Sequence, residues 1–324
     1  MNKKFTNIVL LAIFLVLVIS VNIFAESTVI AYMLPLMGPI HTDRWYAAAA
    51  KAKEMGMEAI VYDAGGYQNI NKQITQVENL IERKVNGIII HATSSTALTE
   101  VLERAVNSGI KVVCEYVPVK SDKMVFPLIC LDAFYTGRLC AVILTAQMGG
   151  RGNILALPGP AGQEEAAERW QGFTDYISLF PQMKVVGQEW TAADIAVAIR
   201  ASENMLTANP QVDGIYTWYD LMSQGMVSAM KARNMKPVPH VTCDLSVECE
   251  KLIREGWITA TEAGAPLATA RAAVELVYKL INGEKVDQLT IKLPPTMLTK
   301  EVLDVFDRKN IVVSEDIKSQ WEKK

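Results

Sequence analysis

The chain has 324 residues, of which 50% are hydrophobic and 21% are charged, and its formal net charge is −3. A chain of this length with a mean hydropathy of +0.16 is too apolar for a disordered protein and too long for one ordinary core. Because 32 Lys and Arg are balanced by 35 Asp and Glu, the sequence offers no basic surface for a phosphate backbone. We therefore predict that nucleic acid is not a partner.

Residues 1–25 have the three parts of a secretory signal peptide. Lys3 and Lys4 give a positive start, residues 8–21 are almost entirely apolar, and a small residue for cleavage follows. A retained membrane anchor is the alternative, but the apolar run is shorter than the roughly 20 residues of a spanning helix. The absence of Cys from residues 22–31 argues against a lipoprotein. We predict export to the periplasm or the extracellular space.

Beyond this segment, short apolar runs alternate with longer helical patterns. The predicted strands cover residues 29–34, 58–62, 87–91, 110–116, 125–131, 153–158, 183–189, 214–217, 239–243 and 257–261. The predicted helices cover residues 45–55, 70–83, 96–108, 134–148, 164–180, 195–208, 222–233 and 268–281. Strands that are apolar on both faces and followed by helices are typical of parallel sheets covered on both sides, so we predict an α/β fold of the doubly wound type.

A short internal sequence repeat indicates that this fold consists of two similar lobes. The sequence VNGII at residues 85–89 recurs as VDGIY at residues 212–216, each time before a short polar loop and a helix. Three hinge crossings between the lobes are predicted, near residues 131–132, 264–266 and 288–292. The predicted division gives an N-terminal lobe of residues 26–131 plus 264–290 and a C-terminal lobe of residues 132–263 plus 291–324.

Candidate ligand contacts lie just after the predicted strands, because open parallel sheets bind ligands beyond the carboxyl ends of their strands. These positions are rich in aromatic and acidic residues. Aromatic faces stack on the apolar faces of sugar rings, and carboxylates accept hydrogen bonds from hydroxyls. Each Trp has core packing as its alternative role, and Asp220 has helix capping as its alternative. The predicted ligand-binding residues are Ile40, His41, Trp45, His91, Tyr116, Trp170, Trp190, Trp218, Tyr219, Asp220 and Asp244.

The sequence carries no signature of catalysis or of cofactor binding. Neither G-x-G-x-x-G after the first strand, nor G-x-x-x-x-G-K-[ST], G-x-S-x-G or H-E-x-x-H occurs. Three His far apart in the chain do not favour a metal site. We predict no enzymatic activity, no cofactor and no metal. The five Cys fit no zinc pattern and are interpreted as buried thiols, with a Cys243–Cys249 disulfide left open: Cys114, Cys130, Cys140, Cys243 and Cys249.

Several short sequence segments occur in an order that is specific for one protein family. They are AKAKEMG at 50–56, QVENLI at 76–81, NSGIKVV at 107–113, ERWQGF at 168–173, DGIY at 213–216 and LTKE at 298–301. With them the chain resembles, from about residue 28 to 305, the type I periplasmic sugar-binding proteins of ABC importers, in particular the ribose-binding group. The resemblance implies two lobes that close around one ligand. We therefore predict a monomer that delivers a sugar or polyol to an ABC permease in the membrane.

The family's ligand positions are only partly kept. Tyr116 replaces an Asp, Ala167 stands where an Arg binds ligand, and Arg169 matches a second Arg that is not a ligand position. Asp220 and Asp244 match retained carboxylates. These changes predict a neutral to negative site that accepts a neutral sugar, a polyol or a cationic amine, because an anionic ligand would face uncompensated like charge.

Two other functions are compatible with the same residues. A sensory binding protein would present its closed form to a chemoreceptor or a sensor kinase, and neighbouring genes would distinguish it from an importer component. A hydrolase would use Asp220 and Asp244 as acid and base. Recovery of the ligand intact after incubation would exclude the hydrolase.

Overall fold

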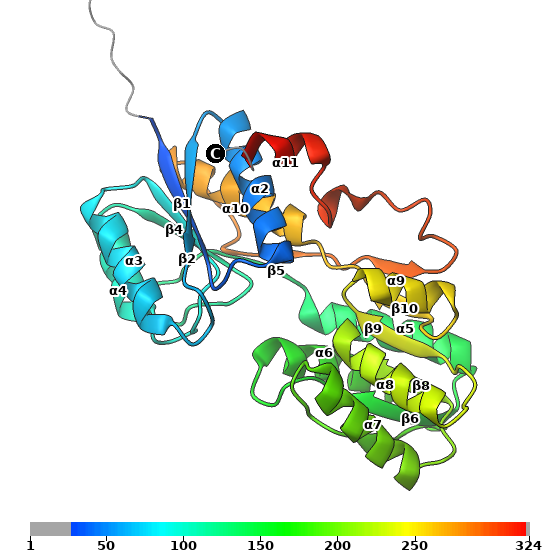
Figure 1. Cartoon of the computed structure of the whole chain (residues 1–324). Coiled ribbons are helices and arrows are strands. Elements are labelled where there is room, and N and C mark those ends of the chain that lie inside the picture. The colour runs from blue at the N-terminus through cyan, green and yellow to red at the C-terminus, as the bar shows by residue number, and fades with distance from the viewer. Residues whose placement is uncertain (1–26, 322–324) are drawn as a thin grey trace, which may run out of the picture.

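A computed structural model describes residues 27–321, so the predicted signal peptide lies outside the described residues. The chain forms two α/β lobes, each built on a six-stranded sheet with helices on both faces, which confirms the predicted fold class (Figure 1). No helix within the described range is long and apolar enough to cross a membrane.

The N-terminal lobe contains a sheet in the order β11-β5-β4-β3-β1-β2, with every neighbouring pair parallel. Helices α2 and α10 cover one face of this sheet, and α3 and α4 cover the other. The elements are β1 (Val29–Leu34), α2 (Pro39–Glu54), β2 (Glu58–Asp63), α3 (Ile70–Glu82), β3 (Gly87–Ile90), α4 (Thr99–Asn107), β4 (Lys111–Glu115), β5 (Leu128–Leu131), α10 (Pro266–Ile281) and β11 (Thr290–Leu293).

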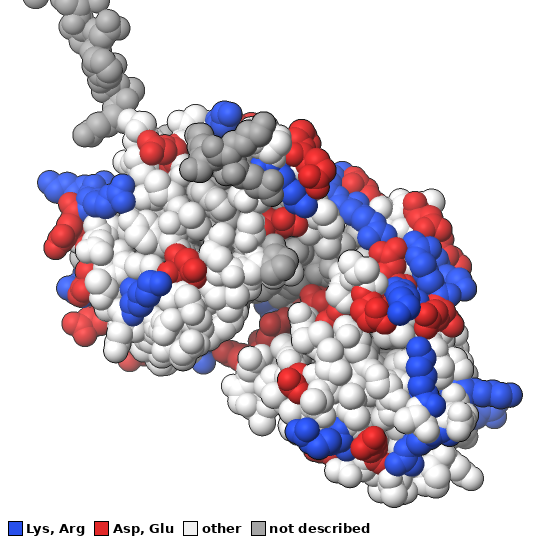
Figure 2. Space-filling view, viewed as in Figure 1, with Lys and Arg blue, Asp and Glu red and all other residues white. Residues whose placement is uncertain are grey.

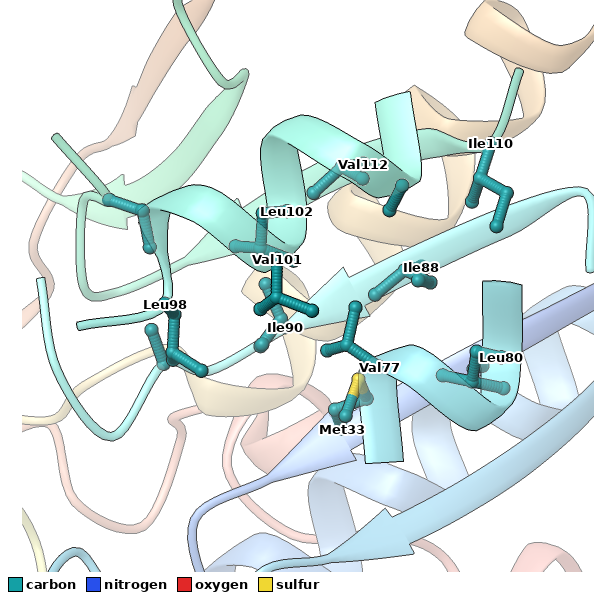
Figure 3. Close-up of a cluster of buried hydrophobic side chains, with 14 of the residues drawn as sticks. Met33, Val77, Leu80, Ile88, Ile90, Leu98, Val101, Leu102, Ile110 and Val112 are labelled. Carbon is teal, nitrogen blue, oxygen red and sulfur yellow. The ribbon is translucent and has the colours of Figure 1, made fainter. Parts of the chain in front are cut away.

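Strand β3 shows why the central strands are apolar at every position. Successive side chains of a strand point to opposite faces of the sheet. Ile88 and Ile90 therefore pack with Val77 and Leu102 of α3 and α4, while Ile89 packs against the other helical layer (Figure 3). A sheet buried on both faces leaves its strand ends as the place where polar side chains can be exposed.

The C-terminal lobe repeats this plan with a sheet in the order β12-β10-β9-β8-β6-β7. Its edge strand β12 runs antiparallel to β10. Helices α5 and α6 cover one face, and α7 and α8 cover the other. The elements are α5 (Ala133–Met148), β6 (Gly152–Leu157), α6 (Glu164–Ile177), β7 (Met183–Gln188), α7 (Ile195–Ala208), β8 (Gly214–Thr217), α8 (Asp220–Ala232), β9 (His240–Cys243), α9 (Val247–Arg254), β10 (Ala260–Glu262) and β12 (Met297–Thr299).

The crossings between the lobes differ from the predicted division in one boundary. The chain crosses between β5 and α5 and between β10 and α10, at the first two predicted places. Strand β11, however, pairs with β5 and continues the N-terminal sheet through Leu293, so the third crossing follows Leu293 and not residue 290. Backbone pairing with β5 decides this boundary, and the sequence around residue 290 gives no sign of it.

The end of the chain also departs from the predicted division, which placed residues 291–324 in the C-terminal lobe. Leu303 and Phe306 pack in that lobe, but Val313 and Ile317 pack against Ala47 of α2. The last helix, α11 (Glu315–Trp321), therefore lies on the N-terminal lobe, where Figure 1 shows it in red beside α2. The C-terminal segment thus makes a fourth connection between the lobes.

Two glycines bring α5 and α6 into backbone contact. A Cβ on Gly137 would lie 1.8 Å from the carbonyl oxygen of Arg169, and one on Gly172 would lie 1.9 Å from that of Phe134. Both distances are far below van der Waals contact, so any larger residue must force the helices apart. Through this contact α5 sets the position of Arg169 at the edge of the cleft.

We expect Gly172→Ala to destabilise the protein by about 2 kcal/mol, because the overpacking penalty exceeds the roughly 1 kcal/mol by which Ala favours a helix over Gly. The measurement is the free energy of unfolding in a denaturant titration. The matched control is Gln171→Ala, an exposed position in the same helix, for which we expect a change within about 0.5 kcal/mol. Equal stabilities for the two variants would contradict the proposed role of the helix contact.

Candidate functional site

A cavity of about 160 Å³ lies between the lobes at the carboxyl ends of the strands. Figure 2 shows the gap between the lobes, with acidic side chains in its depth. Both lobes contribute to the lining, as expected for a ligand site of an open α/β sheet. The lining residues are Ile40, His41, Arg44, Tyr67, His91, Tyr116, Leu131, Glu165, Arg169, Trp218, Tyr219, Asp244, Gly264 and Pro266.

Aromatic rings form the wall of the N-terminal lobe. His91 follows β3 and stacks on Tyr116, which follows β4, with ring centroids 5.6 Å apart and an interplanar angle of 21°. The ring centroid of His41 lies 5.7 Å from that of His91. The Tyr67 ring packs edge-on against His91 at a centroid distance of 5.8 Å. Four rings, one from the first turn of α2 and three from the loops after β2, β3 and β4, therefore line the cleft together.

A buried ion pair between Arg44 and Glu115 contacts the aromatic residues of this wall. Arg44 and Glu115 are 3% and 0% exposed, and their Nη2 and Oε2 atoms are 2.8 Å apart. The hydroxyl of Tyr32 donates a hydrogen bond of 2.6 Å to the same carboxylate oxygen. The guanidinium of Arg44 also lies 4.6 Å from the ring centroid of Tyr116, within the range of a cation–π contact. Burial alone would lower the pKa of Arg44, but Glu115 and its neighbours raise it, so this residue stays charged.

The two histidines of the wall are neutral at pH 7. Burial, and then the charge of Arg44, lower the pKa of His41 to about 4. The same two causes hold the pKa of His91 well below its usual value. The wall therefore offers aromatic faces and neutral hydrogen-bonding groups to the cleft. Its buried cation, Arg44, is neutralised by Glu115.

Trp218 and Tyr219 form the facing wall in the C-terminal lobe. Their ring centroids are 5.7 Å apart, and both residues connect β8 to α8. The indole fits against Gly159, where a Cβ would lie 2.8 Å from its ring atoms. The indole Nε1 of Trp218 is buried and has no hydrogen-bond partner within residues 27–321.

Arg169 occupies the place in this lobe that Arg44 has in the other. It is 3% exposed and pairs with Glu165 one helical turn earlier. Its guanidinium donates a 3.2 Å hydrogen bond to the carbonyl oxygen of Trp218 and lies 5.7 Å from the centroid of the indole. Each lobe thus places one buried, paired arginine against an aromatic residue of its wall.

Asp244 adds an acidic group whose charge depends on pH. Burial raises the pKa of Asp244 to about 7 against the opposing charge of Arg169, and the carboxylates of Glu262 and Glu165 raise it further. Tyr116 and Asp244 both have left-handed backbone conformations, with φ of +63° and +68°. Such conformations are costly for residues other than glycine and gather at functional sites. Each follows a central strand of its sheet, β4 or β9.

Comparison with known proteins places this geometry in a family. Residues 30–285 match the periplasmic binding protein domain. The chain belongs to the periplasmic binding protein family. This result confirms the predicted family and fits the two-lobed fold with its site in the cleft.

Individual relatives are similar over most of their length. The ribose import binding protein of Salmonella typhimurium is 25% identical over 287 residues, which are 88% of this chain and 95% of that protein. The D-apiose import binding protein of Actinobacillus succinogenes is 26% identical over 81% of this chain and 85% of its own length. A periplasmic solute binding protein of an ABC transporter from the same organism, solved with bound D-allose, superposes with a TM-score of 0.79 at 23% identity and covers 87% of this chain and 100% of its own.

Within this family fold, the structure brings seven of the predicted site residues to the cavity: Ile40, His41, His91, Tyr116, Trp218, Tyr219 and Asp244. They remain predicted ligand contacts, now with a shared surface. Four others do not line the cavity. Trp45 is buried in the N-terminal core 6.4 Å from Tyr32, and Trp170 stacks on Phe173 in the C-terminal core at 5.4 Å.

The remaining two predicted residues, Trp190 and Asp220, also lie outside the lining. Trp190 follows β7 at the edge of the sheet and is partly exposed. Asp220 is buried as the first residue of α8, where an acidic side chain favours the positive end of the helix dipole. Burial raises the pKa of Asp220. The N-cap of α8 is Tyr219 and no side chain caps the helix there, so the capping alternative for Asp220 is not confirmed.

The predicted charge of the site needs correction, because Arg44 was missed and Arg169 was predicted not to be a ligand position. The loss of one family Arg predicted a site without positive charge, yet Arg44 and Arg169 both line the cavity. Glu165 and Tyr67 were missed as well. The site is charge-compensated, since the arginines pair with Glu115 and Glu165.

We expect the stability of the protein to fall between pH 4 and pH 7 through Asp244. With a folded-state pKa of about 7, Asp244 keeps a proton that the unfolded chain releases near pH 4. Over this interval the unfolded state binds fewer protons, so the free energy of unfolding decreases by about 1.4 kcal/mol per pH unit, and above pH 7 this contribution is constant.

The test compares Asp244→Asn with the wild type in denaturant titrations at pH 5, 6, 7 and 8. Asn tolerates the left-handed conformation and cannot ionise. We expect the free energy of unfolding of the wild type to decrease relative to that of the variant as the pH rises to 7. Above pH 7 the difference between the two proteins should stay constant. A constant difference over the whole range would show that Asp244 titrates normally.

Proposed function

We propose that this protein is an extracytoplasmic solute-binding protein that captures a small neutral sugar or polyol between its two lobes. In this proposal the ligand is released unaltered to an ABC permease, the protein acts as a monomer, and residues 1–25 direct its export. The family is made up of binding proteins, which supports a role in transport and not in catalysis.

The cavity carries this proposal through its combination of aromatic walls and compensated charge. Tyr116 and His91 face the cleft from one lobe and Trp218 from the other, which suits the apolar faces of a sugar ring. Each arginine is paired within its own lobe, and burial keeps His41 and His91 neutral. A ligand with net charge would leave a desolvated charge without a partner.

Known relatives support the same ligand class. The similar proteins named above are import binding proteins for ribose and for D-apiose, and one was solved with D-allose. All three ligands are neutral monosaccharides. Their variety fits a shared scaffold whose pocket residues differ, as Tyr116 and Tyr219 already indicate in this chain.

Catalysis by paired carboxylates finds no support in the geometry. The hydrolase alternative requires Asp220 and Asp244 to face one substrate, and only Asp244 lines the cavity. Presentation of the closed form to a sensor protein would use the same cleft as import. Neighbouring permease and ATPase genes would indicate import, and a neighbouring sensor kinase gene would indicate sensing.

We expect isothermal titration to show tight binding of a neutral monosaccharide or polyol from a panel that also holds uronates, sugar phosphates and quaternary amines. We expect Trp218→Ala to weaken this binding at least tenfold, because the indole supplies stacking area to the cavity wall. The matched control is Trp190→Ala, a partly exposed Trp outside the cavity, which should bind as the wild type does. Tight binding confined to the anionic or the cationic compounds would overturn the proposal.

A further inference from the structure

One chain of hydrogen bonds at the N-terminal wall has a fixed direction. Arg44 Nη1 lies 2.9 Å from Nδ1 of His91, and Nε2 of the same ring lies 3.3 Å from the hydroxyl oxygen of Tyr67. A guanidinium has five N–H donors and no acceptor. In the pair of Arg44 and His91, the arginine must therefore donate and Nδ1 must accept.

The tautomer of His91 follows from this pairing. An accepting Nδ1 carries no proton, so the neutral ring holds its one proton on Nε2. This nitrogen faces Tyr67, and the N–H donates to the tyrosine oxygen. The phenolic proton of Tyr67 is then not needed for His91 and is free to point elsewhere.

The ring of His91 is held in this orientation from several sides. Tyr116 stacks on one face, and Arg44 is itself fixed by its ion pair with Glu115. The side-chain amide of Gln73 donates a 3.1 Å hydrogen bond to the main-chain carbonyl of His91. A ring flip would place the Cδ2 carbon opposite Arg44, and the Nδ1–H tautomer would place a second donor there, so either change would lose the acceptor for the buried guanidinium.

We propose that Tyr67 is a specificity-determining residue whose hydroxyl proton is directed into the cavity, so that the ligand must place a hydrogen-bond acceptor at this point. Arg44 and His91 act through Tyr67 as positioning residues. The inference rests on the proposed sugar-binding function and deepens it.

The two walls then have opposite hydrogen-bonding character. Tyr67 donates from the N-terminal lobe, while the carboxyl groups of Glu165 and Asp244 provide acceptors on the C-terminal lobe. A sugar hydroxyl both accepts and donates, and so it suits either wall. An alkylammonium group has only donors and could not accept the proton of the Tyr67 hydroxyl, which would be left unpaired, at a penalty, once the bound ligand displaces water from it. This polarity favours a polyhydroxy ligand over the cationic amine that the sequence left open.

The first test reads the tautomer of His91 directly. Imidazole ¹⁵N chemical shifts of the ligand-free mature protein at pH 7 distinguish the two neutral tautomers and the protonated ring. Because the chain has three His, a His91→Gln variant identifies the His91 signals by their loss. We expect the Nε2–H tautomer, and an Nδ1–H tautomer or a doubly protonated ring would overturn the inference.

The second test measures the effect of the Tyr67 hydroxyl on binding. D-Ribose and D-allose are the first probes, and the monosaccharide from the panel that binds most tightly is then compared with its monodeoxy derivatives. We expect Tyr67→Phe to weaken the parent sugar about tenfold and to leave one monodeoxy derivative unaffected, namely the one that lacks the accepting oxygen. Tyr135→Phe, at an exposed tyrosine of α5 outside the cavity, is the matched control.

The two tests separate this inference from the proposed function. Unchanged affinity of Tyr67→Phe, or an equal loss for every monodeoxy sugar, would overturn the role of Tyr67 while sugar binding stands. A panel in which no neutral sugar or polyol binds would overturn the proposed function. The ¹⁵N measurement needs no ligand, so it decides the direction of the hydrogen-bond chain in either case.

Discussion

The buried ion pair between Arg44 and Glu115 is the interaction on which the N-terminal half of the site depends. An unpaired charge at this depth would cost several kcal/mol, so each residue constrains where the other can lie. Glu115 ends β4 and also accepts the hydroxyl of Tyr32 from β1, which ties α2 to two central strands. From this anchor Arg44 reaches both His91 and Tyr116, so the aromatic wall is organised around one charge.

Much of the fold could be predicted because its central strands are buried on both faces and its helices are not. The strands at Val29–Leu34 and Gly214–Thr217 have the predicted bounds, since each is a short apolar run. The differences have local or tertiary causes. The first helix begins at Pro39 and not at residue 45, because Pro suits the first helical position. The fifth strand begins only at Leu128, after a proline that lacks the N–H for a ladder. The path of residues 313–321 onto α2 depends on apolar contacts that no local pattern reveals.

The site was less predictable, because neighbouring residues on a helix point about 100° apart. At both arginine positions, the aromatic residue that follows was chosen as the ligand contact. Arg44 faces the cleft while Trp45 faces the sheet, and Arg169 lines the cavity while Trp170 enters the core. Tyr116 and Asp244 were predicted because they directly follow strands, and His41 because it lies in the first turn of α2, shortly after β1. The side chains of Arg44, further along α2, and of Arg169 in α6 could not be predicted in this way, because packing sets their direction. The preference for aromatic residues over arginines therefore selected, in each pair, the residue that packs in the core.

The two arginines also bear on how the lobes move. Each is compensated by a carboxylate of its own lobe, so opening the cleft separates no buried charge. Among the described residues, Lys120 and Glu164 form an ion pair across the cleft at 3.5 Å, but both side chains are more than half exposed, and such pairs contribute little. Charge therefore gives neither the open nor the closed form a large advantage. A ligand can shift the balance only by bonding to both walls at once, and this requires one molecule that accepts from the first lobe and donates to the second.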